Sequence, residues 1–464
     1  MKYSNIMTND DKDIFIPLVP SVLGAMLMSK VSRQKEGFRE DLIKMVEEDM
    51  INLPKENQLE HFKNSVVVAN GFMEKWGVNY GHSSIKELDT LQMCIENKSR
   101  WFSEIIETVM PSKYISYIEY SLRYNPPKSY YIPSEFYDNE LLLEEYKEFC
   151  DECFRLYEKI NFDFYSIIDK KYSDLSEREK KLKAFENARN VLPLSTISNM
   201  GLQSNLRAFC DMLCELFSYE GINNEIFETA KLMKSEAEIV SVGMVKHTKP
   251  TDYLKSYVKS KYEREFINDE YKIYKEPKVI VDNEIVGDLS KISNFGNLEL
   301  MNRFDRLPNI FRNIGKYVTI YMSESAHHQF IRHRSFDFIT KFPDVKYGIL
   351  LPSEILNLDG SNQDIINIAN GIEKDILEIY KKSCDLYEKI VKYGYIHLAP
   401  YVVLNCNIRK IEFFGNLSAM NNFVTLRKEI HAQDEIRKVA NDLDDNFKDF
   451  EKKILGYKND KNMI

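Results

Sequence analysis

Residues 329–334 read Gln-Phe-Ile-Arg-His-Arg, so that two arginines flank His333. Guanidinium groups stay charged and donate forked hydrogen bonds that match the oxygens of phosphate or pyrophosphate. A basic triplet at the end of a helix is also a common solvated surface, or a partner of the helix dipole. This segment is therefore a candidate anion site that needs support from other parts of the chain.

A second segment with chemical potential covers residues 416–427, which read Asn-Leu-Ser-Ala-Met-Asn-Asn-Phe-Val-Thr-Leu-Arg, and continues to His431-Ala-Gln433. On a helix, Asn416 and Asn422 could point towards a common groove. Arg427 and His431, four residues apart, would share one helical face. This segment offers amide, guanidinium and imidazole groups to one ligand.

The third segment lies in the N-terminal half, where residues 116–124 read Ser-Tyr-Ile-Glu-Tyr-Ser-Leu-Arg-Tyr. Glu119, Ser121 and Arg123 alternate, so in an extended segment they would project from one side. An amphipathic edge strand would have the same pattern without any ligand.

Apolar spacing of i, i+3 and i+4 predicts helices around these segments, and β-branched runs predict strands. The predicted helices cover 22–45, 62–76, 140–171 and, as one or two helices, 204–234. Strands are predicted at 278–282 and 316–322, the second followed by a helix into Arg332. Residues 247–276 form the expected connection, and the charged tail 442–461 is expected to be a solvated helix or disordered.

Three short segments recur in the same order in the two halves of the chain. The pairs are 131–135 with 350–354, 156–160 with 386–390, and 205–209 with 416–420. A spacing of about 220 residues indicates duplicated domains and not a short-repeat solenoid.

Composition limits the class of protein. The 464 residues carry a formal charge of −9, which argues against a nucleic-acid polymer as partner. The N-terminus lacks a signal-peptide pattern, and no segment approaches ~18 consecutive apolar residues, so we expect a cytoplasmic protein that does not enter a membrane. The seven cysteines have no disulfide-framework spacing, and Cys150 and Cys153 are expected to be buried thiols.

Together the segments resemble the flavin-dependent thymidylate synthases over most of both halves, and more specifically a long, tandem branch of that family. The resemblance rests on Gly81-His-Ser-Ser84, on residues 116–124, on Glu186-Asn-Ala-Arg-Asn-Val-Leu-Pro-Leu194, on Arg332-His-Arg334, and on Leu426-Arg427 with His431-Ala-Gln433. It implies an α+β fold with two tandem copies, residues 1–245 and 246–464, each helix-rich with a mainly antiparallel sheet.

The departures from the family pattern are complementary. In the first copy, Pro111-Ser-Lys113 stands where Arg-His-Arg belongs, and Leu216 stands in place of the reactive-site arginine. In the second copy, residues 337–344 replace the Glu/Ser/Arg element, and Pro400 occupies the place of Arg189. The family assembles each site from several subunits of a homotetramer, so two different halves can jointly supply one complete site. A homodimer of this chain would then mimic the tetramer.

The resemblance also implies the chemistry: dUMP is methylated with methylenetetrahydrofolate as carbon donor, reduced FAD as hydride source and NADPH as reductant, without a cysteine nucleophile. Arg427 would stabilise negative charge on the uracil ring. The residues implied for the nucleotide are Glu119, Ser121, Arg123, Arg189 and Gln329. The residues implied for FAD are His82, Asn205, Arg207, Arg332, His333, Arg334, Asn416, Asn422 and His431.

Three alternatives remain open at this point. A related flavin-dependent modification of another pyrimidine nucleotide would use the same scaffold. A non-catalytic protein that binds flavin or nucleotide would share the binding residues. A zinc site at His327, His328 and His333 is disfavoured, because their spacing does not stack them on one helical face and no carboxylate motif accompanies them, so no metal is expected.

Overall fold

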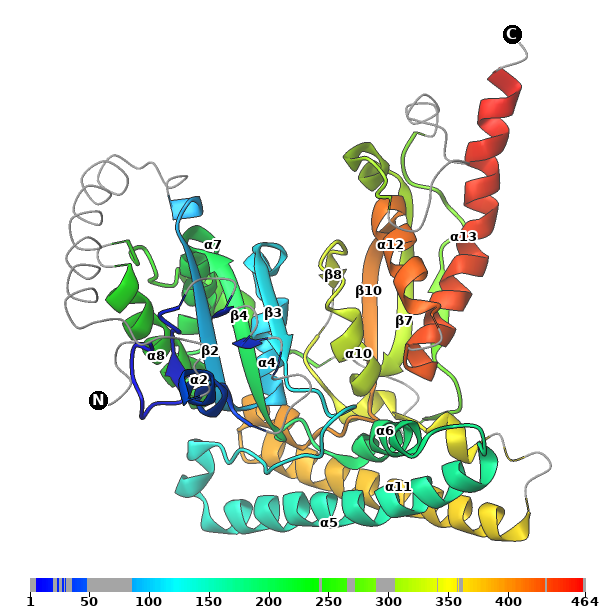
Figure 1. Ribbon diagram of the computed structural model, residues 1–464, viewed down its shortest axis with the longest axis horizontal. Helices are drawn as coiled ribbons and strands as arrows, with labels where there is room; N and C mark the ends of the chain where they lie inside the picture. Colours follow the sequence, from blue (N-terminus) through cyan, green and yellow to red (C-terminus); the bar gives the residue numbers. More distant parts are fainter. Residues whose placement is uncertain are drawn as a thin grey trace. The chain divides into compact units, whose positions relative to one another are not determined.

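The computed structural model describes residues 6–19, 36–47, 86–241, 244–264, 272–288, 305–339, 341–356, 362–429 and 432–461, with isolated positions at 23, 24, 27, 28, 30 and 358. The chain divides into two compact units, and Figure 1 labels helices and strands of both. Unit 1 comprises Met1–Asn161, Asp174–Glu263 and Asp385–Val402. Unit 2 comprises Phe162–Ser173, Arg264–Cys384 and Val403–Ile464. The units are therefore not simply consecutive halves of the chain.

Unit 1 contains a four-stranded antiparallel sheet in the order β1-β2-β4-β3. Its strands are β1 (Ile14–Phe15), β2 (Thr90–Ser99), β3 (Ile115–Glu119) and β4 (Ile197–Asn205). The helices α4 (Arg100–Thr108) and α7 (Leu206–Phe217) begin directly where β2 and β4 end. The sheet thereby fixes the start of both helices.

Unit 2 contains a second antiparallel sheet of four strands, in the order β6-β7-β10-β8. Its strands are β6 (Lys278–Val281), β7 (Gly315–Ser323), β8 (Phe338–Ile339) and β10 (Ile408–Asn416). The helices α10 (Glu324–Phe330) and α12 (Leu417–Arg427) follow β7 and β10 without a break. The arrangement of strands and helices repeats that of unit 1.

The duplication extends to the caps of the equivalent helices. The Oγ atoms of Ser99 and Ser323 accept from the third helical backbone N–H, at 2.9 and 3.2 Å. The side chains of Asn205 and Asn416 cap α7 and α12 in the same way, each at 2.9 Å. Such caps satisfy N–H groups that the helix itself leaves unpaired.

A carboxylate on a later helix holds each serine cap. Glu225 on α8 (Asn224–Val240) accepts from the backbone N and the Oγ of Ser99, both at 2.7 Å. Glu435 on α13 (Asp434–Lys461) accepts from the backbone N of Ser323 at 2.6 Å and from its Oγ. The same device ties a helix to the sheet in both units.

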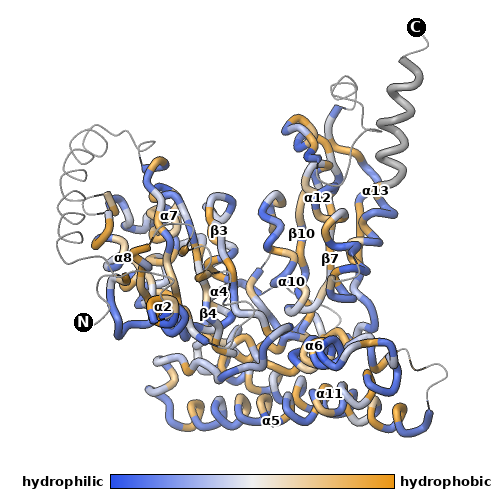
Figure 2. The backbone as a smooth tube through the Cα atoms, in the orientation of Figure 1, coloured by the Kyte–Doolittle hydropathy of each residue, from blue (hydrophilic) through white to orange (hydrophobic). Residues whose placement is uncertain are grey.

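Two long helices, α5 (Glu140–Lys171) and α11 (Gln363–Lys392), alternate hydrophobic and hydrophilic residues along their length (Figure 2). No described helix is long and apolar enough to cross a membrane.

The remaining helices of the described ranges are α2 (Phe38–Glu47), α6 (Glu177–Ala188) and α9 (Asp252–Ser260). Short 3-10 helices span Met110–Tyr114, Ser134–Asp138, Arg189–Val191, Asn309–Asn313, Val345–Tyr347, Ser353–Ile355 and Ile396–Val402, and β5 (Ile273–Tyr274) pairs in parallel with β9 (Ile349–Leu350).

The predicted α+β class, with an antiparallel sheet in each of two copies, is confirmed. The helix predicted over 140–171 matches α5 residue for residue, and the predicted strands 278–282 and 316–322 correspond to β6 and β7. The helix predicted at 62–76 lies outside the described residues, as does most of the one predicted at 22–45. The charged tail belongs to α13, which begins at Asp434.

Candidate functional site

An aromatic cluster in unit 2 sets the position of the basic segments. Phe330, the last residue of α10, lies 5.3 Å from Phe413 of β10 and 5.0 Å from Phe423 of α12, between ring centroids. Phe336 stacks on Phe330 at 5.6 Å. Because these rings are buried together, the Arg-His-Arg turn after α10 is held against α12.

Arg427, at the C-terminal end of α12, contacts this turn. Its Nε donates to Nε2 of His333 at 2.8 Å, and its Nη2 donates to the backbone oxygen of Gln329 at 3.2 Å. Two nitrogens of the guanidinium are thereby fixed. The structure brings together three residues that the sequence assigned to one site.

His333 is buried and packs its ring edge-to-face on Phe423, with centroids 4.8 Å apart. Burial, and then the nearby positive charge of Arg427, lower the pKa of His333 to about 3. The imidazole is therefore neutral and accepts the hydrogen bond from Arg427. The positive charge of the pair stays on the guanidinium.

Gln329 and Gln433 form an amide pair inside unit 2. The Nε2 of Gln329 donates to Oε1 of Gln433 and, at 3.3 Å, to the backbone oxygen of Ser325. Gln433 in turn donates to Ser325 Oγ at 3.3 Å. The sequence reasoning did not single out Gln433, although it is the final residue of the His-Ala-Gln element. The side chain of Gln329, expected to contact the nucleotide, is buried in this network.

The two arginines of the triplet are half-buried, and Nε of Arg332 donates to the backbone oxygen of His328 at 3.2 Å. Half-buried guanidinium groups at the end of a helix are a donor set that fits a pyrophosphate.

The common groove expected for Asn416 and Asn422 is not formed. The Oδ1 of Asn416 caps α12, and its Nδ2 donates to the backbone oxygen of Ser335 at 3.3 Å. Asn422 is exposed on the helix surface. Asn422 lies six residues after Asn416, and at about 3.6 residues per turn this spacing points the two side chains in different directions. Asn416 therefore caps its helix, as Asn205 does in unit 1.

The prediction that residues 116–124 form an extended segment, with Glu119, Ser121 and Arg123 on one side, is wrong beyond Glu119. Strand β3 ends at Glu119, and a turn follows in which Tyr124 N and Asn125 N donate to the oxygen of Ser121. The buried Glu119 accepts from Ser198 Oγ at 3.0 Å and lies 3.6 Å from the Arg100 guanidinium. Its carboxylate is thus part of an internal ion pair.

Glu186 brings together the two arginines assigned to the nucleotide. Nε of Arg123 lies 2.8 Å from a carboxylate oxygen of Glu186, and Nε of Arg189 donates to the backbone oxygen of Glu186 at 3.3 Å. Arg189 is buried, whereas Arg123 is half-buried. Sequence reasoning placed Glu186 within the matching motif but gave it no role.

The remaining predicted residues divide into two groups. Arg207 is exposed and forms an ion pair with Glu87 at 2.6 Å. His82 and His431 lie outside the described residues. Helix α12 ends at Arg427, so the helical i, i+4 relation expected between Arg427 and His431 is not provided by that helix.

The predicted burial of Cys150 and Cys153, which both lie on α5, is confirmed. Burial, the largest cause, raises the pKa of Cys150 to about 12. Such a thiol stays protonated at neutral pH and is a poor nucleophile.

Comparison with known proteins covers both units. Residues 25–240 and 304–450 match the family described as thymidylate synthase complementing protein. The chain is also 24% identical over 443 residues to the UPF0159 protein Ta1429 of Thermoplasma acidophilum, which covers 80% of this chain and 85% of that protein. The family match takes in the Arg-His-Arg turn, Arg427, and the Arg123 and Arg189 pair. The chain therefore belongs to the family of thymidylate synthase complementing proteins.

Proposed function

We propose that this protein methylates dUMP to dTMP, with methylenetetrahydrofolate as carbon donor, FAD as cofactor and NADPH as reductant. The observation that carries the proposal is the guanidinium of Arg427, fixed at two nitrogens beside a neutral histidine. A fixed positive charge needs little reorganisation when negative charge develops on a uracil ring. Bound FAD would supply the hydride, and Arg332 and Arg334 would hold its pyrophosphate.

Arg123 and Arg189 would bind the nucleotide phosphate. Both contact Glu186, Arg123 through the carboxylate and Arg189 through the backbone oxygen, and a phosphate offers several acceptor oxygens to such donors. The nucleotide side of the site then comes from the first copy, and the activating arginine comes from the second. A homodimer is the proposed assembly, as the resemblance implies for a duplicated chain.

Flavin binding gives a direct test. The purified protein is expected to bind FAD, and NADPH is expected to bleach its absorbance when both are present. The double variant Arg332→Ala/Arg334→Ala should lose FAD, because each hydrogen bond to a charged group contributes ~1.5–3 kcal/mol. Lys410→Ala, a change to a cation elsewhere in unit 2, should retain it. Unchanged FAD occupancy in the double variant would contradict the assignment.

A further inference from the structure

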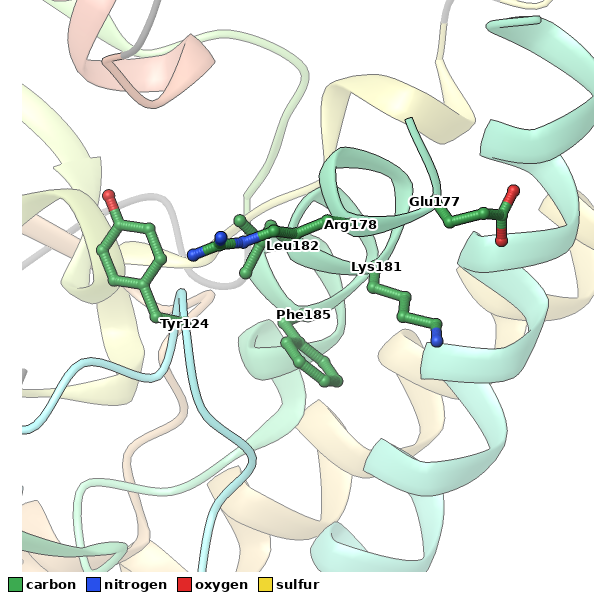
Figure 3. Close-up of a pocket in the computed structure, with 6 residues that line it drawn as sticks. All are labelled: Tyr124, Glu177, Arg178, Lys181, Leu182 and Phe185. Atoms are coloured by element: carbon green, nitrogen blue, oxygen red, sulfur yellow. The ribbon is translucent and has the colours of Figure 1, made fainter. Parts of the chain in front are cut away.

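Unit 1 contains a pocket of about 630 Å³ beside helix α6, lined by Tyr124, Glu177, Arg178, Lys181, Leu182 and Phe185 (Figure 3). A volume of this size lies in the range of small-molecule sites, about 300–1,000 Å³. None of these residues was assigned a role by the sequence motifs. The pocket is therefore a separate feature with its own chemistry to explain.

The walls of the pocket combine an aromatic ring, apolar side chains and a cation. The ring of Tyr124 is 43% exposed, and Leu182 and Phe185 are half-buried. The guanidinium of Arg178 extends towards Tyr124, while Glu177 and Lys181 point away from that ring (Figure 3). Tyrosine and arginine planes both stack on flat rings, and arginine also binds carboxylate or phosphate.

Arg178 is not neutralised by its neighbours. Its side chain forms no ion pair or hydrogen bond with any residue in the described ranges, although the first turn of α6 contains two glutamates. Glu179 is engaged in the capping box with Ser176, and Glu177 lies 3.4 Å from Lys180. In a chain with a formal charge of −9, an arginine without an acidic partner at a pocket wall favours an anionic ligand.

The pocket adjoins the pair of arginines described above. Tyr124 follows Arg123 directly, and the guanidinium carbon of Arg123 lies 5.6 Å from the centroid of the Tyr124 ring. Phe185 directly precedes Glu186, the partner of Arg123. A ligand in the pocket would therefore lie next to the residues that, in the proposed function, bind the nucleotide phosphate.

We propose that this pocket binds a co-substrate of the reaction, a molecule in which a flat heteroaromatic ring is joined to an anionic group. Its anion would pair with Arg178, and its ring would stack on Tyr124. Reduced folates and nicotinamide dinucleotide phosphates share this chemistry. The need for such a co-substrate rests on the proposed function, whereas its location rests on the pocket.

Equilibrium binding to the full-length protein tests the assignment without any turnover. The probes are 5-formyltetrahydrofolate, NADPH and dUMP, each titrated separately by calorimetry. The variants are Arg178→Glu, which reverses the charge, and Leu182→Trp, which fills the pocket. Lys231→Glu, an equal charge change at an exposed helical position of unit 1, is the matched control.

Both pocket variants should weaken the binding of one of the two co-substrate probes about ten- to hundredfold, the range for losing one charged hydrogen bond. The probe that is weakened identifies the source of the ring and anion. The binding of dUMP, and all binding by Lys231→Glu, should change less than about twofold. Unchanged binding of both co-substrate probes in both variants, or binding of neither probe by the unaltered protein, would overturn the assignment. Absence of dUMP binding with normal pocket binding would contradict the proposed function alone.

Discussion

Arg427 is held by His333 and by the backbone of Gln329, so the direction of its guanidinium is set before any ligand binds. Arg427→Lys keeps the positive charge and loses the planar fork. We expect dTMP formation to fall by about two orders of magnitude, comparable to the loss of one preorganised donor, while FAD occupancy is unchanged. Steady-state product formation and flavin absorbance measure the two effects. Near-normal turnover would rule out this role, and Lys428→Ala at the neighbouring exposed position is the control.

His333 gives the folded protein a defined sensitivity to acid. Its pKa is about 3 in the fold, against 6.5 for an ordinary histidine. Between these pH values the unfolded chain binds a proton that the folded chain does not, so the free energy of unfolding decreases as the pH falls. Relative to His333→Gln, the wild type should lose about 2 kcal/mol between about pH 7.5 and about pH 5. Urea unfolding at the two pH values, with the exposed His247→Gln as control, measures this difference; a constant difference would contradict the neutral buried state.

Single residues were predictable from sequence only where a motif marks them. The grouping of His333, Gln329 and Arg427 followed from the family pattern, and the structure brings them together. The engagement of Gln329 with Gln433 could not be foreseen, because residues about a hundred positions apart meet only after the sheet has formed. The turn after Glu119 was missed because Ser121 and Arg123 continue a strand-like alternation beyond the end of the strand.

Among the secondary-structure elements, the helices α4 and α10 each begin with a charged residue that forms a buried ion pair. This residue is an arginine in α4 and a glutamate in α10. In unit 1 Arg100 on α4 lies 3.6 Å from Glu119. In unit 2 Glu324 on α10 accepts two hydrogen bonds from Arg409 of β10, both at 2.9 Å. Buried pairs of this kind depend on both partners, since one alone leaves an uncompensated charge.

Arg409→Leu should therefore destabilise the protein by ~3–5 kcal/mol. Arg409→Leu combined with Glu324→Leu should cost less than the two single changes together, because no lone charge is left buried. Chemical unfolding of the three variants measures the coupling. If the loss of stability in the double variant equals the sum of the losses in the two single variants, the pair does not act as a unit.

Long periodic elements were the best predicted part of the fold. The 32-residue helix α5 and the strand β7 carry strong periodic patterns, and both were located from sequence. The sequence could not predict that Phe162–Ser173 belongs to unit 2 and Asp385–Val402 to unit 1. Local periodicity indicates a helix or a strand, but it does not reveal which segments pack together.

At the scale of the whole molecule, the second copy offers a matched control for the first. Asp344 aligns with Arg123 and is engaged by Arg264, with oxygen–nitrogen distances of 2.6 and 2.8 Å. Arg123→Ala should weaken dUMP binding about ten- to hundredfold, whereas Asp344→Asn should leave it within about twofold. Calorimetric titration measures both, and thermal melting checks that Asp344→Asn remains folded. Equal weakening by the two variants would argue against a nucleotide site in the first copy.

In the proposed function, one catalytic site takes its nucleotide contacts from the first copy and its activating arginine from the second. Product analysis of the full-length protein with dUMP, methylenetetrahydrofolate, FAD and NADPH tests this composite site. We expect dTMP from the wild type, and a loss of activity of about two orders of magnitude or more in each of Arg123→Ala and Arg427→Ala at non-saturating dUMP. Wild-type rates in either variant, or no dTMP from a wild-type protein that binds FAD and dUMP, would contradict it.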